Sequence, residues 1–366
     1  MSAAGIYIHV PFCLRKCPYC AFYSRIYSTE AAEEYVRAVC RNIAALADRD
    51  ITADTVYFGG GTPSLLTSEQ VGHILDTVRK SVHLADPEIT LEANPTSVTE
   101  EKLRDWLEAG VNRLSVGFQS ADDEQLKFLG RLHDSAGAEN AVIKAREAGF
   151  RSISCDLILG SEGQDIGSLD RTLDRLLSLP IDHLSAYMLK IEEGTPFDSA
   201  EIRSRTADDD TLADLYERLC SRMSAAGWEH YEISNFARER SYRSRHNTKY
   251  WRLDPYIGIG PSAHSDFGGR RYYCPDDLSA FIEADLQPTE TEDSSPDRAE
   301  EYVMLGLRLS EGVDLGRLTE YGGDAEAFMR RAKRFAGTGL LTIDGERVSL
   351  TEKGFLVSNS LIAELV

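Results

Sequence analysis

The stretch Tyr7-Ile-His-Val-Pro-Phe-Cys13-Leu-Arg-Lys-Cys17-Pro-Tyr-Cys20 joins an apolar run to three closely spaced cysteines. Residues 6–10 have the composition of a buried strand, and the cysteines follow it directly with the spacing CxxxCxxC. Thiolates bind the irons of iron–sulfur clusters, and three thiolates leave one iron of a four-iron cluster without a protein ligand. We therefore expect a [4Fe-4S] cluster on Cys13, Cys17 and Cys20.

A zinc site is the alternative for these cysteines, with His9 as a fourth ligand. His9 lies inside the expected strand, where successive side chains point to opposite faces. Structural zinc sites also take paired ligands from two separate segments. Both points favour the cluster over zinc.

A glycine-rich motif, Gly59-Gly-Gly-Thr62-Pro-Ser64, follows the second expected strand. S-adenosylmethionine (SAM) can chelate an open cluster iron through its amino and carboxylate groups, and its one-electron cleavage gives a 5′-deoxyadenosyl radical. Glycines let the backbone approach such a ligand closely. We expect Gly60, Gly61 and Thr62 to bind the amino end of SAM; the alternative is an ordinary turn.

Short β-branched runs alternate with helical patterns over the first two thirds of the chain. Strands are expected at residues 6–10, 55–58, 88–92, 113–117, 152–157 and 183–187, and helices at 29–47, 67–82, 99–109, 136–148 and 166–177. This alternation predicts an α/β fold with a parallel sheet, specifically a partial (β/α)6 barrel. Such barrels carry their chemistry on the loops after the strands.

Three units are expected along the chain. They are a barrel core with the cluster and SAM sites, a cap over the barrel, and a small C-terminal α+β domain, at residues 1–205, 206–292 and 293–366. Residues 287–295 are rich in Pro, Thr, Ser and acidic side chains, which is typical of a linker. Helices at 296–309 and 324–337, followed by a hairpin over 340–350, resemble a winged-helix module.

Charge argues against nucleic acid as a partner. The 366 residues include 40 basic and 60 acidic ones, a net charge of −20, and residues 293–366 hold nine basic against thirteen acidic side chains. A polyanion is repelled by such a surface. DNA binding by the winged-helix-like domain is therefore disfavoured.

No apolar run approaches the roughly 20 residues of a membrane span, and the N-terminal residues lack the pattern of a signal peptide. We therefore expect a cytoplasmic protein without a membrane span. An odd number of cysteines, seven, also favours reduced thiols over a disulfide framework. Cys40, Cys155, Cys220 and Cys274 are isolated and are expected to be core residues.

Polar residues recur at or just beyond the ends of the expected strands: Glu92, Gln119, Arg131 and Asp156. Carboxylates there can accept hydrogen bonds from an ammonium group or from ribose hydroxyls, and Arg131 can pair with a carboxylate. Taken singly, each residue could equally be a helix cap or a surface charge.

At this point a family resemblance is specific. The motifs YIHVPFC, GGGTPS, LEANP, GFQS, LGRLH, DLILG and HLSAYMLKIEEGTP follow one another over roughly residues 5 to 290. In them the chain resembles the radical SAM family of oxygen-independent coproporphyrinogen III dehydrogenases (HemN) and HemW-type heme chaperones. The resemblance implies that Cys13, Cys17 and Cys20 bind the cluster. It also implies a set of residues around SAM: Tyr7, Tyr19, Gly60, Gly61, Thr62, Glu92, Gln119, Arg131 and Asp156.

Three features favour the chaperone branch of this family. Only twelve residues precede Cys13, position 22 is Phe22 where the dehydrogenases have a further cysteine, and residues 246–251 match the HNxxYW motif of HemW-like proteins. This branch implies heme as bound cargo and apo-hemoproteins of the respiratory chain as recipients. It also makes His246 a candidate heme ligand, flanked by Tyr250 and Trp251; the alternative is a hydrogen-bonded loop histidine.

Two competing functions stay open. One is the dehydrogenase reaction, in which the radical abstracts a hydrogen from a propionate of coproporphyrinogen III and decarboxylation gives the vinyl groups of protoporphyrinogen IX. The other is a radical reaction on an unrelated metabolite, which leaves HNxxYW unexplained. The residues do not decide whether SAM is cleaved, and the resemblance favours a protein without dehydrogenase activity.

Overall fold

The computed structural model describes residues 3–366, and within them a single open sheet of twelve strands forms the centre of the molecule. Six neighbouring parallel strands make up its middle: β1 (Ala4–Val10), β4 (Thr52–Gly60), β5 (His83–Ala93), β6 (Arg113–Gln119), β7 (Ser152–Leu159) and β8 (His183–Met188). All six coincide with strands expected from the sequence. The expected α/β fold with a mostly parallel sheet is confirmed.

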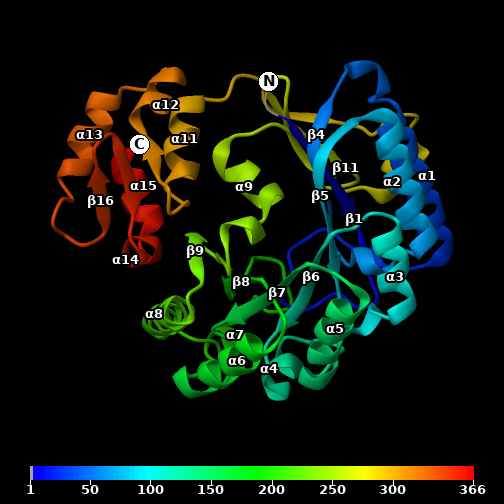
Figure 1. Cartoon of the computed structure of the whole chain (residues 1–366), viewed down its shortest axis with the longest axis horizontal. Helices are drawn as coiled ribbons and strands as arrows, with labels where there is room; N and C mark the ends of the chain where they lie inside the picture. Colours follow the sequence, from blue (N-terminus) through cyan, green and yellow to red (C-terminus); the bar gives the residue numbers. More distant parts are fainter. Residues whose placement is uncertain (1–2) are drawn as a thin grey trace.

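Helices between these strands cover the outer, convex face of the curved sheet (Figure 1). They are α1 (Thr29–Ala44), α2 (Ser68–Ser81), α3 (Glu100–Glu108), α4 (Asp123–Phe128), α5 (Ser135–Ala148) and α6 (Ile166–Ser178). In α2 the Thr67 side chain accepts from the Gln70 backbone N–H, and the Gln70 side chain accepts from the Thr67 backbone N–H. None of the helices within residues 3–366 has the length and apolarity needed to cross a bilayer.

The sheet continues at both ends but does not close. Beyond β1 lie β11 (Tyr256–Ile259), β12 (His264–Phe267), β13 (Arg270–Tyr273) and β14 (Glu290–Asp293); beyond β8 lie β10 (Asn235–Ala237) and β9 (Glu229–Glu232). The two edge strands, β14 and β9, do not pair with each other, so the barrel that the described residues form is partial.

One expectation for this region is corrected. Residues 287–295, expected as a linker, contain the strand β14, which pairs with β13 at the edge of the sheet. All four residues of β14 are exposed, so the strand carries no alternation of apolar and polar side chains that a sequence pattern could reveal.

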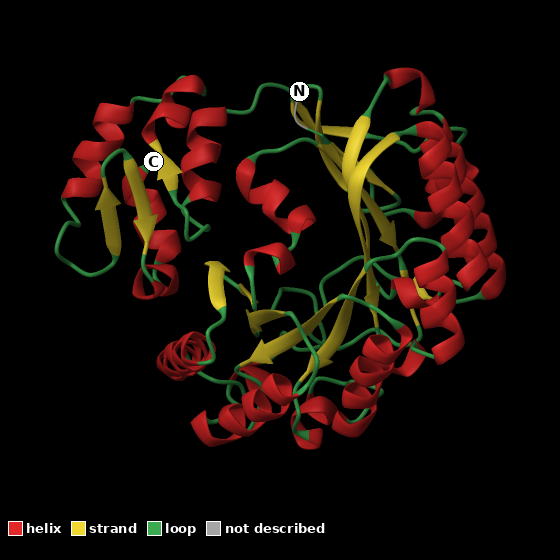
Figure 2. Ribbon diagram, viewed as in Figure 1, coloured by secondary structure: helices red, strands yellow, loops and turns green. Residues whose placement is uncertain are grey.

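Helix α9 (Arg245–Arg252) lies on the concave side of the sheet, in the open side of the barrel (Figure 2). The buried Lys249 ammonium contacts the Ala3 carbonyl oxygen and an Asp54 carboxylate oxygen, each at 2.7 Å. These contacts hold α9 against the amino-terminal ends of β1 and β4. The segment expected as a loop is therefore a helix that fills the barrel from that end.

The C-terminal domain combines a three-stranded antiparallel sheet with short helices. Its elements are α11 (Arg298–Gly306), β15 (Val313–Asp314), α12 (Leu315–Glu320), α13 (Ala325–Lys333), β16 (Leu341–Asp344), β17 (Arg347–Leu350), α14 (Glu352–Leu356) and α15 (Ser358–Leu365). The expected hairpin is β16–β17. Backbone hydrogen bonds from Ser310 to Tyr231 (3.0 Å) and from Ile233 to Arg308 (2.9 Å) dock the domain on β9.

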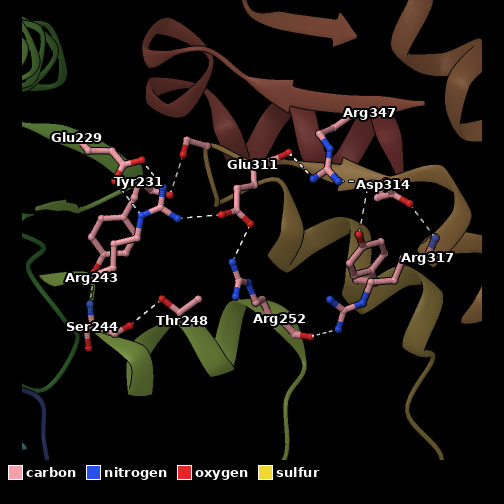
Figure 3. Close-up of polar contacts among 12 residues, drawn as sticks. Glu229, Tyr231, Arg243, Ser244, Thr248, Arg252, Glu311, Asp314, Arg317 and Arg347 are labelled. Carbon is pink, nitrogen blue, oxygen red and sulfur yellow. Dashed lines mark hydrogen bonds and ion pairs between the residues drawn. The ribbon is translucent and has the colours of Figure 1, made fainter. Parts of the chain in front are cut away.

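Ion pairs reinforce this docking (Figure 3). Arg243 contacts Glu229 on β9 and also donates to Glu311 of the C-terminal domain at 2.8 Å. Arg252, the last residue of α9, donates to the same Glu311 carboxylate at 2.7 Å. Helix α9 and the C-terminal domain are thus joined through one shared acidic side chain.

Candidate functional site

The cysteine loop begins where β1 ends. Its first residues form a short strand, β2 (Phe12–Cys13), which pairs with β3 (Arg25–Ile26). Phe12 is fully buried and meets the Tyr35 ring edge-on, with 5.4 Å between ring centroids. This buried aromatic pair anchors one end of the loop, and the three cysteine side chains beyond it are half-buried.

The three thiols do not gather around one point, and two of them have hydrogen-bond donors beside them. Within residues 3–366, the one group of His, Cys, Asp or Glu side chains that brings its ligand atoms within 4.8 Å of one another does not include these cysteines. The three sulfurs of this loop therefore do not converge as the ligands of one zinc ion would. Cys13 Sγ accepts from Thr62 Oγ1 at 3.6 Å, and Cys17 Sγ accepts from Arg131 Nη1 at 3.5 Å. Such donors stabilise thiolates, the form that binds iron.

The glycine motif packs directly on the cysteine loop. Gly60 has a φ of +109°, and a Cβ there would lie 2.8 Å from the His9 ring. A Cβ on Gly61 would lie 2.7 Å from the Phe12 carbonyl oxygen. Only glycine permits this approach of β4 to the cysteine loop.

A small cavity of about 110 Å³ opens at the carboxyl ends of β4 to β7. It brings together six of the nine residues expected around SAM: Gly61, Thr62, Glu92, Gln119, Arg131 and Asp156. Thr62 and Arg131 also contact cysteine sulfurs, so the cavity adjoins the cluster loop. The strand ends therefore place these side chains together, as the sequence predicts.

Two half-buried carboxyl groups face this cavity. Glu92 accepts a hydrogen bond from the Tyr57 hydroxyl at 2.7 Å, and Asp156 accepts one from Ser115 at 3.3 Å. Burial raises the pKa of Glu92 to about 7, and the nearby Asp156 adds to the rise. Burial likewise raises the pKa of Asp156 to about 6. A cationic ligand at this position would relieve the cost of ionising both groups.

Three of the expected SAM residues lie outside the small cavity. Tyr19 packs against Phe197, with 6.2 Å between ring centroids. Gly60 faces His9, and the Tyr7 hydroxyl lies 3.0 Å from His9 Nδ1. They surround the cavity rather than line it.

A second, larger cavity of about 480 Å³ lies beside the first and shares Glu92 with it. Its walls combine aromatic and polar side chains from the barrel, α9 and the C-terminal domain: Tyr7, Tyr57, Glu92, Tyr187, Glu232, Ile233, Ser234, Asn235, His246, Asn247, Tyr250, Trp251 and Arg308. A volume of this size suits a bound organic ligand.

Sequence reasoning missed Glu232 in this wall. Its carboxyl group is 1% exposed, neither oxygen has a hydrogen-bond partner, and burial raises its pKa to about 8. No pattern in the sequence marks it, because residues 229–232 read Glu-His-Tyr-Glu and are mostly polar.

His246 does not lie in a loop, as the sequence suggests, but in the first turn of α9, where it is 1% exposed. Its Nδ1 lies 2.8 Å from Thr55 Oγ1, and its Nε2 lies 2.8 Å from the Tyr250 hydroxyl. Burial lowers its pKa to about 3, so the ring is neutral at neutral pH. Both ring nitrogens are engaged, and a metal could reach Nε2 only after Tyr250 moves.

Comparison with known proteins assigns this chain to a family. Residues 7–176 match the model of the radical SAM superfamily, and residues 293–357 match the HemN C-terminal domain. The chain is 35% identical to the heme chaperone HemW of Escherichia coli, over 98% of this chain and 97% of that protein. It is 34% identical to the HemW of Bacillus subtilis, over 97% of both. The chain belongs to the HemW family of radical SAM proteins.

A solved structure supports the fold of this HemW-family chain. Coproporphyrinogen III oxidase (HemN) from E. coli, described as a radical SAM enzyme, superposes with a TM-score of 0.84 over 99% of this chain and 90% of its own, at 22% identity. The likeness covers the barrel and the C-terminal domain. It therefore shows the fold and leaves the choice of function to other observations.

Membership of the radical SAM superfamily implies a [4Fe-4S] cluster and SAM as cofactors of this HemW-family chain. The residues present fit both groups. The loop offers three accessible thiols beside hydrogen-bond donors, and the adjoining cavity offers two half-buried carboxyls with raised pKa values. Arg131 also has a buried Nε without a partner there.

Proposed function

We propose that this chain is a heme chaperone that binds heme as cargo and delivers it to apo-hemoproteins. The observation that carries the proposal is its similarity to HemW proteins over almost the whole length of both chains. The similarity spans the barrel and the C-terminal domain, so every wall of the larger cavity falls within it. Which hemoproteins receive the heme, including those of the respiratory chain, belongs to the proposal.

In this proposal, Cys13, Cys17 and Cys20 hold the cluster, which supplies an electron to SAM when both are bound. Gly60, Gly61 and Thr62 hold the amino end of SAM. Glu92 and Asp156 accept hydrogen bonds from its ammonium group and ribose, while Gln119 and Arg131 bind its remaining polar groups. Tyr7 and Tyr19 close the sides. Such thiol chemistry needs a reducing compartment, so we propose the cytoplasm.

The larger cavity is the proposed place for heme. Tyr187, Tyr250 and Trp251 offer aromatic faces to a porphyrin, and the Arg308 guanidinium offers a partner for a propionate. His246 is neutral and lies in the same wall, so its Nε2 can act as an axial ligand once the Tyr250 side chain has moved away.

The decisive experiment separates the chaperone from the dehydrogenase. Anaerobically reconstituted protein is incubated with heme in one sample, and with SAM, reductant and coproporphyrinogen III in another. We expect a shift of the heme Soret band and no protoporphyrinogen. Decarboxylation of coproporphyrinogen III without heme binding would contradict the chaperone proposal and favour the enzyme.

A further inference from the structure

A group of potential metal ligands lies outside both cavities, at the contact between the barrel and the C-terminal domain. Cys220 comes from α8 (Asp209–Ala225), His230 from β9, and Glu352 is the first residue of α14. His230 Nδ1 lies 3.9 Å from Cys220 Sγ and 3.9 Å from Glu352 Oε1, and the three ligand atoms all lie within 4.8 Å of one another. Cys220 is 1% exposed, as expected of a core residue, and it has two further potential ligands beside it.

The hydrogen bonds of His230 determine which nitrogen is free to bind a metal. The Tyr216 hydroxyl lies 2.8 Å from the Ile233 carbonyl oxygen and donates its single proton to it. The same hydroxyl oxygen lies 3.4 Å from His230 Nε2, so it accepts the Nε2 proton. Nδ1 then carries a lone pair, and it is the nitrogen that faces Cys220 and Glu352.

The ring of His230 is held in this orientation by aromatic neighbours. It stacks on Phe236, with 4.2 Å between ring centroids, and meets Phe355 edge-on at 5.3 Å. Phe355 belongs to the C-terminal domain, like Glu352. Packing from both domains, together with the bond from Nε2 to a second group, is the support that metal-ligating histidines commonly have.

The charges of the group favour a cation at its centre. With the ring proton on Nε2, the imidazole cannot donate from Nδ1. An imidazole lone pair and a carboxylate oxygen, both acceptors, therefore face each other, and the thiol of Cys220 holds the one proton available to them. A divalent cation would satisfy all three ligand atoms at once.

A catalytic Cys–His–Glu arrangement does not explain the group. A base in such an arrangement holds the thiol with one ring nitrogen and the carboxylate with the other. Here both the thiol and the carboxylate lie at Nδ1, and Nε2 is occupied by Tyr216. Burial also raises the pKa of the Cys220 thiol to about 12, which removes its reactivity.

We propose that Cys220, His230 and Glu352 bind one zinc ion that joins the barrel to the C-terminal domain. Thiolate, imidazole and carboxylate together suit zinc, and bond lengths of about 2.0–2.3 Å place tetrahedral ligand atoms about 3.3–3.6 Å apart. The two distances of 3.9 Å from His230 Nδ1 exceed this spacing by a few tenths of an ångström, and the third pair lies within 4.8 Å. Binding releases the thiol proton to solvent, and the half-exposed Glu352 leaves an entry path and a position for water.

The test uses the full chain with its cluster loaded, because empty cluster cysteines would themselves bind zinc. The protein is dialysed anaerobically against buffered zinc, and bound zinc is measured by elemental analysis. We expect about one zinc per chain, and at least a roughly tenfold loss of zinc affinity in Cys220→Ser, His230→Gln and Glu352→Gln. Glu364→Gln is the matched control, since its side chain is 56% exposed against 54% for Glu352 and lies in the same domain.

A second measurement keeps the result independent of folding defects. Zinc should raise the melting temperature of the wild type and of Glu364→Gln, because an ion that binds the folded state stabilises it, and it should leave Glu352→Gln unchanged. The proposal is overturned if cluster-loaded wild type takes up no zinc, or if Glu352→Gln binds zinc with wild-type affinity. Neither outcome depends on heme binding.

Discussion

Half-buried polar side chains set the chemistry of the barrel interior. Glu92 and Asp156 are two carboxyls in one small cavity, and burial raises the pKa of both although arginine side chains nearby oppose the rise. Thr62 and Arg131 extend from that cavity to the cysteine sulfurs. Because these groups contact one another, a substitution here can affect the cluster, SAM binding and stability together, and each effect needs its own measurement.

Loss of any cluster ligand should remove the cluster. Replacing Cys13, Cys17 or Cys20 with alanine is expected to abolish the broad absorbance at about 400 nm that thiolate-ligated clusters give. Cys40→Ala and Cys155→Ala should keep it, because these thiols lie elsewhere in the fold. Absorbance and iron content after anaerobic reconstitution measure the effect, and a full four-iron cluster in Cys17→Ala would refute the assignment.

Glu92 should lower the stability of the SAM-free protein as pH rises. Burial raises the folded-state pKa of Glu92 from 4.5 to about 7, so between these values the folded state binds more protons than the unfolded state. The stability that Glu92 contributes is therefore fully present at the acidic end and is lost as pH rises through 7, by on the order of 1–3 kcal/mol. Thermal unfolding of wild type and Glu92→Gln from pH 5 to 8 measures this contribution as the difference between their slopes; equal slopes would contradict the assignment.

The SAM site has its own test at Glu92. Glu92→Ala removes a half-buried acceptor that faces the small cavity, and should weaken SAM binding while the cluster absorbance stays intact. Equilibrium binding of SAM to the cluster-loaded protein is the measurement. Wild-type SAM affinity in this variant would exclude Glu92 from the site.

Substitutions of His246 and Tyr250 distinguish a heme-binding role of the histidine from a structural one. If Nε2 binds heme iron, His246→Ala should lose or alter the Soret band, with cluster absorbance and SAM binding kept. Tyr250→Phe should then tighten heme binding by up to about tenfold, because it removes the hydrogen bond of about 0.5–1.5 kcal/mol that covers Nε2. Wild-type spectra and affinities in both variants would make His246 a structural residue.

At the scale of elements, helix α9 covers the open side of the sheet and supplies part of the wall of the larger cavity. Its His246 ring rests against β1 at Gly5, where an added Cβ would lie 3.0 Å from His246 Cε1 and 3.0 Å from Thr55 Oγ1. A glycine in the first strand thus leaves the space that the helix occupies. The walls of the larger cavity come from α9 and β9 together with β1 and β4, the strands that carry Tyr7 and Tyr57.

Gly5→Ala should therefore loosen α9. We expect a loss of about 1–3 kcal/mol of stability from overpacking, together with weaker heme binding. The control is Gly72→Ala in α2, where an added Cβ meets no atom within 4 Å and should be neutral or stabilising. Melting temperatures and heme titrations of the two variants measure the difference, and equal behaviour would show that the contact at Gly5 is unimportant.

On the scale of the whole molecule, the C-terminal domain completes the site by packing against β9, α8 and α9. Glu311 accepts from both Arg243 and Arg252, and Arg317 donates to the Arg252 carbonyl oxygen at 2.8 Å (Figure 3). Arg308 of this domain reaches the wall of the larger cavity. Separation of the domains would open that cavity.

Glu311→Gln should weaken the docking. The substitution leaves two arginines without their shared carboxylate, at an expected cost of about 1–2 kcal/mol once partial solvent screening is included. Limited proteolysis should then cut faster around residues 293–298, before the C-terminal domain. Glu326→Gln, an exposed carboxylate of the same domain, should be cut like the wild type.

The sequence by itself determined what depends on contiguous residues. The cysteine loop, the glycine motif, the six parallel strands and the hairpin β16–β17 each follow from local spacing or periodicity, since the signal and the structure occupy the same few residues. Because parallel strands end at one edge of a sheet, even the meeting of Glu92, Gln119 and Asp156 could be foreseen from their positions after successive strands.

Only the tertiary structure decided what depends on residues far apart in the chain. His246 meets Thr55 although 191 residues separate them, and Glu352 meets His230 from another domain. Strand β14 is exposed on every residue, so the partner strand, and no pattern of its own, makes it a strand. Burial is a property of the folded molecule. It makes His246 inaccessible and raises the pKa of Glu92 and Glu232. Folding also brings Cys220 to its two neighbours.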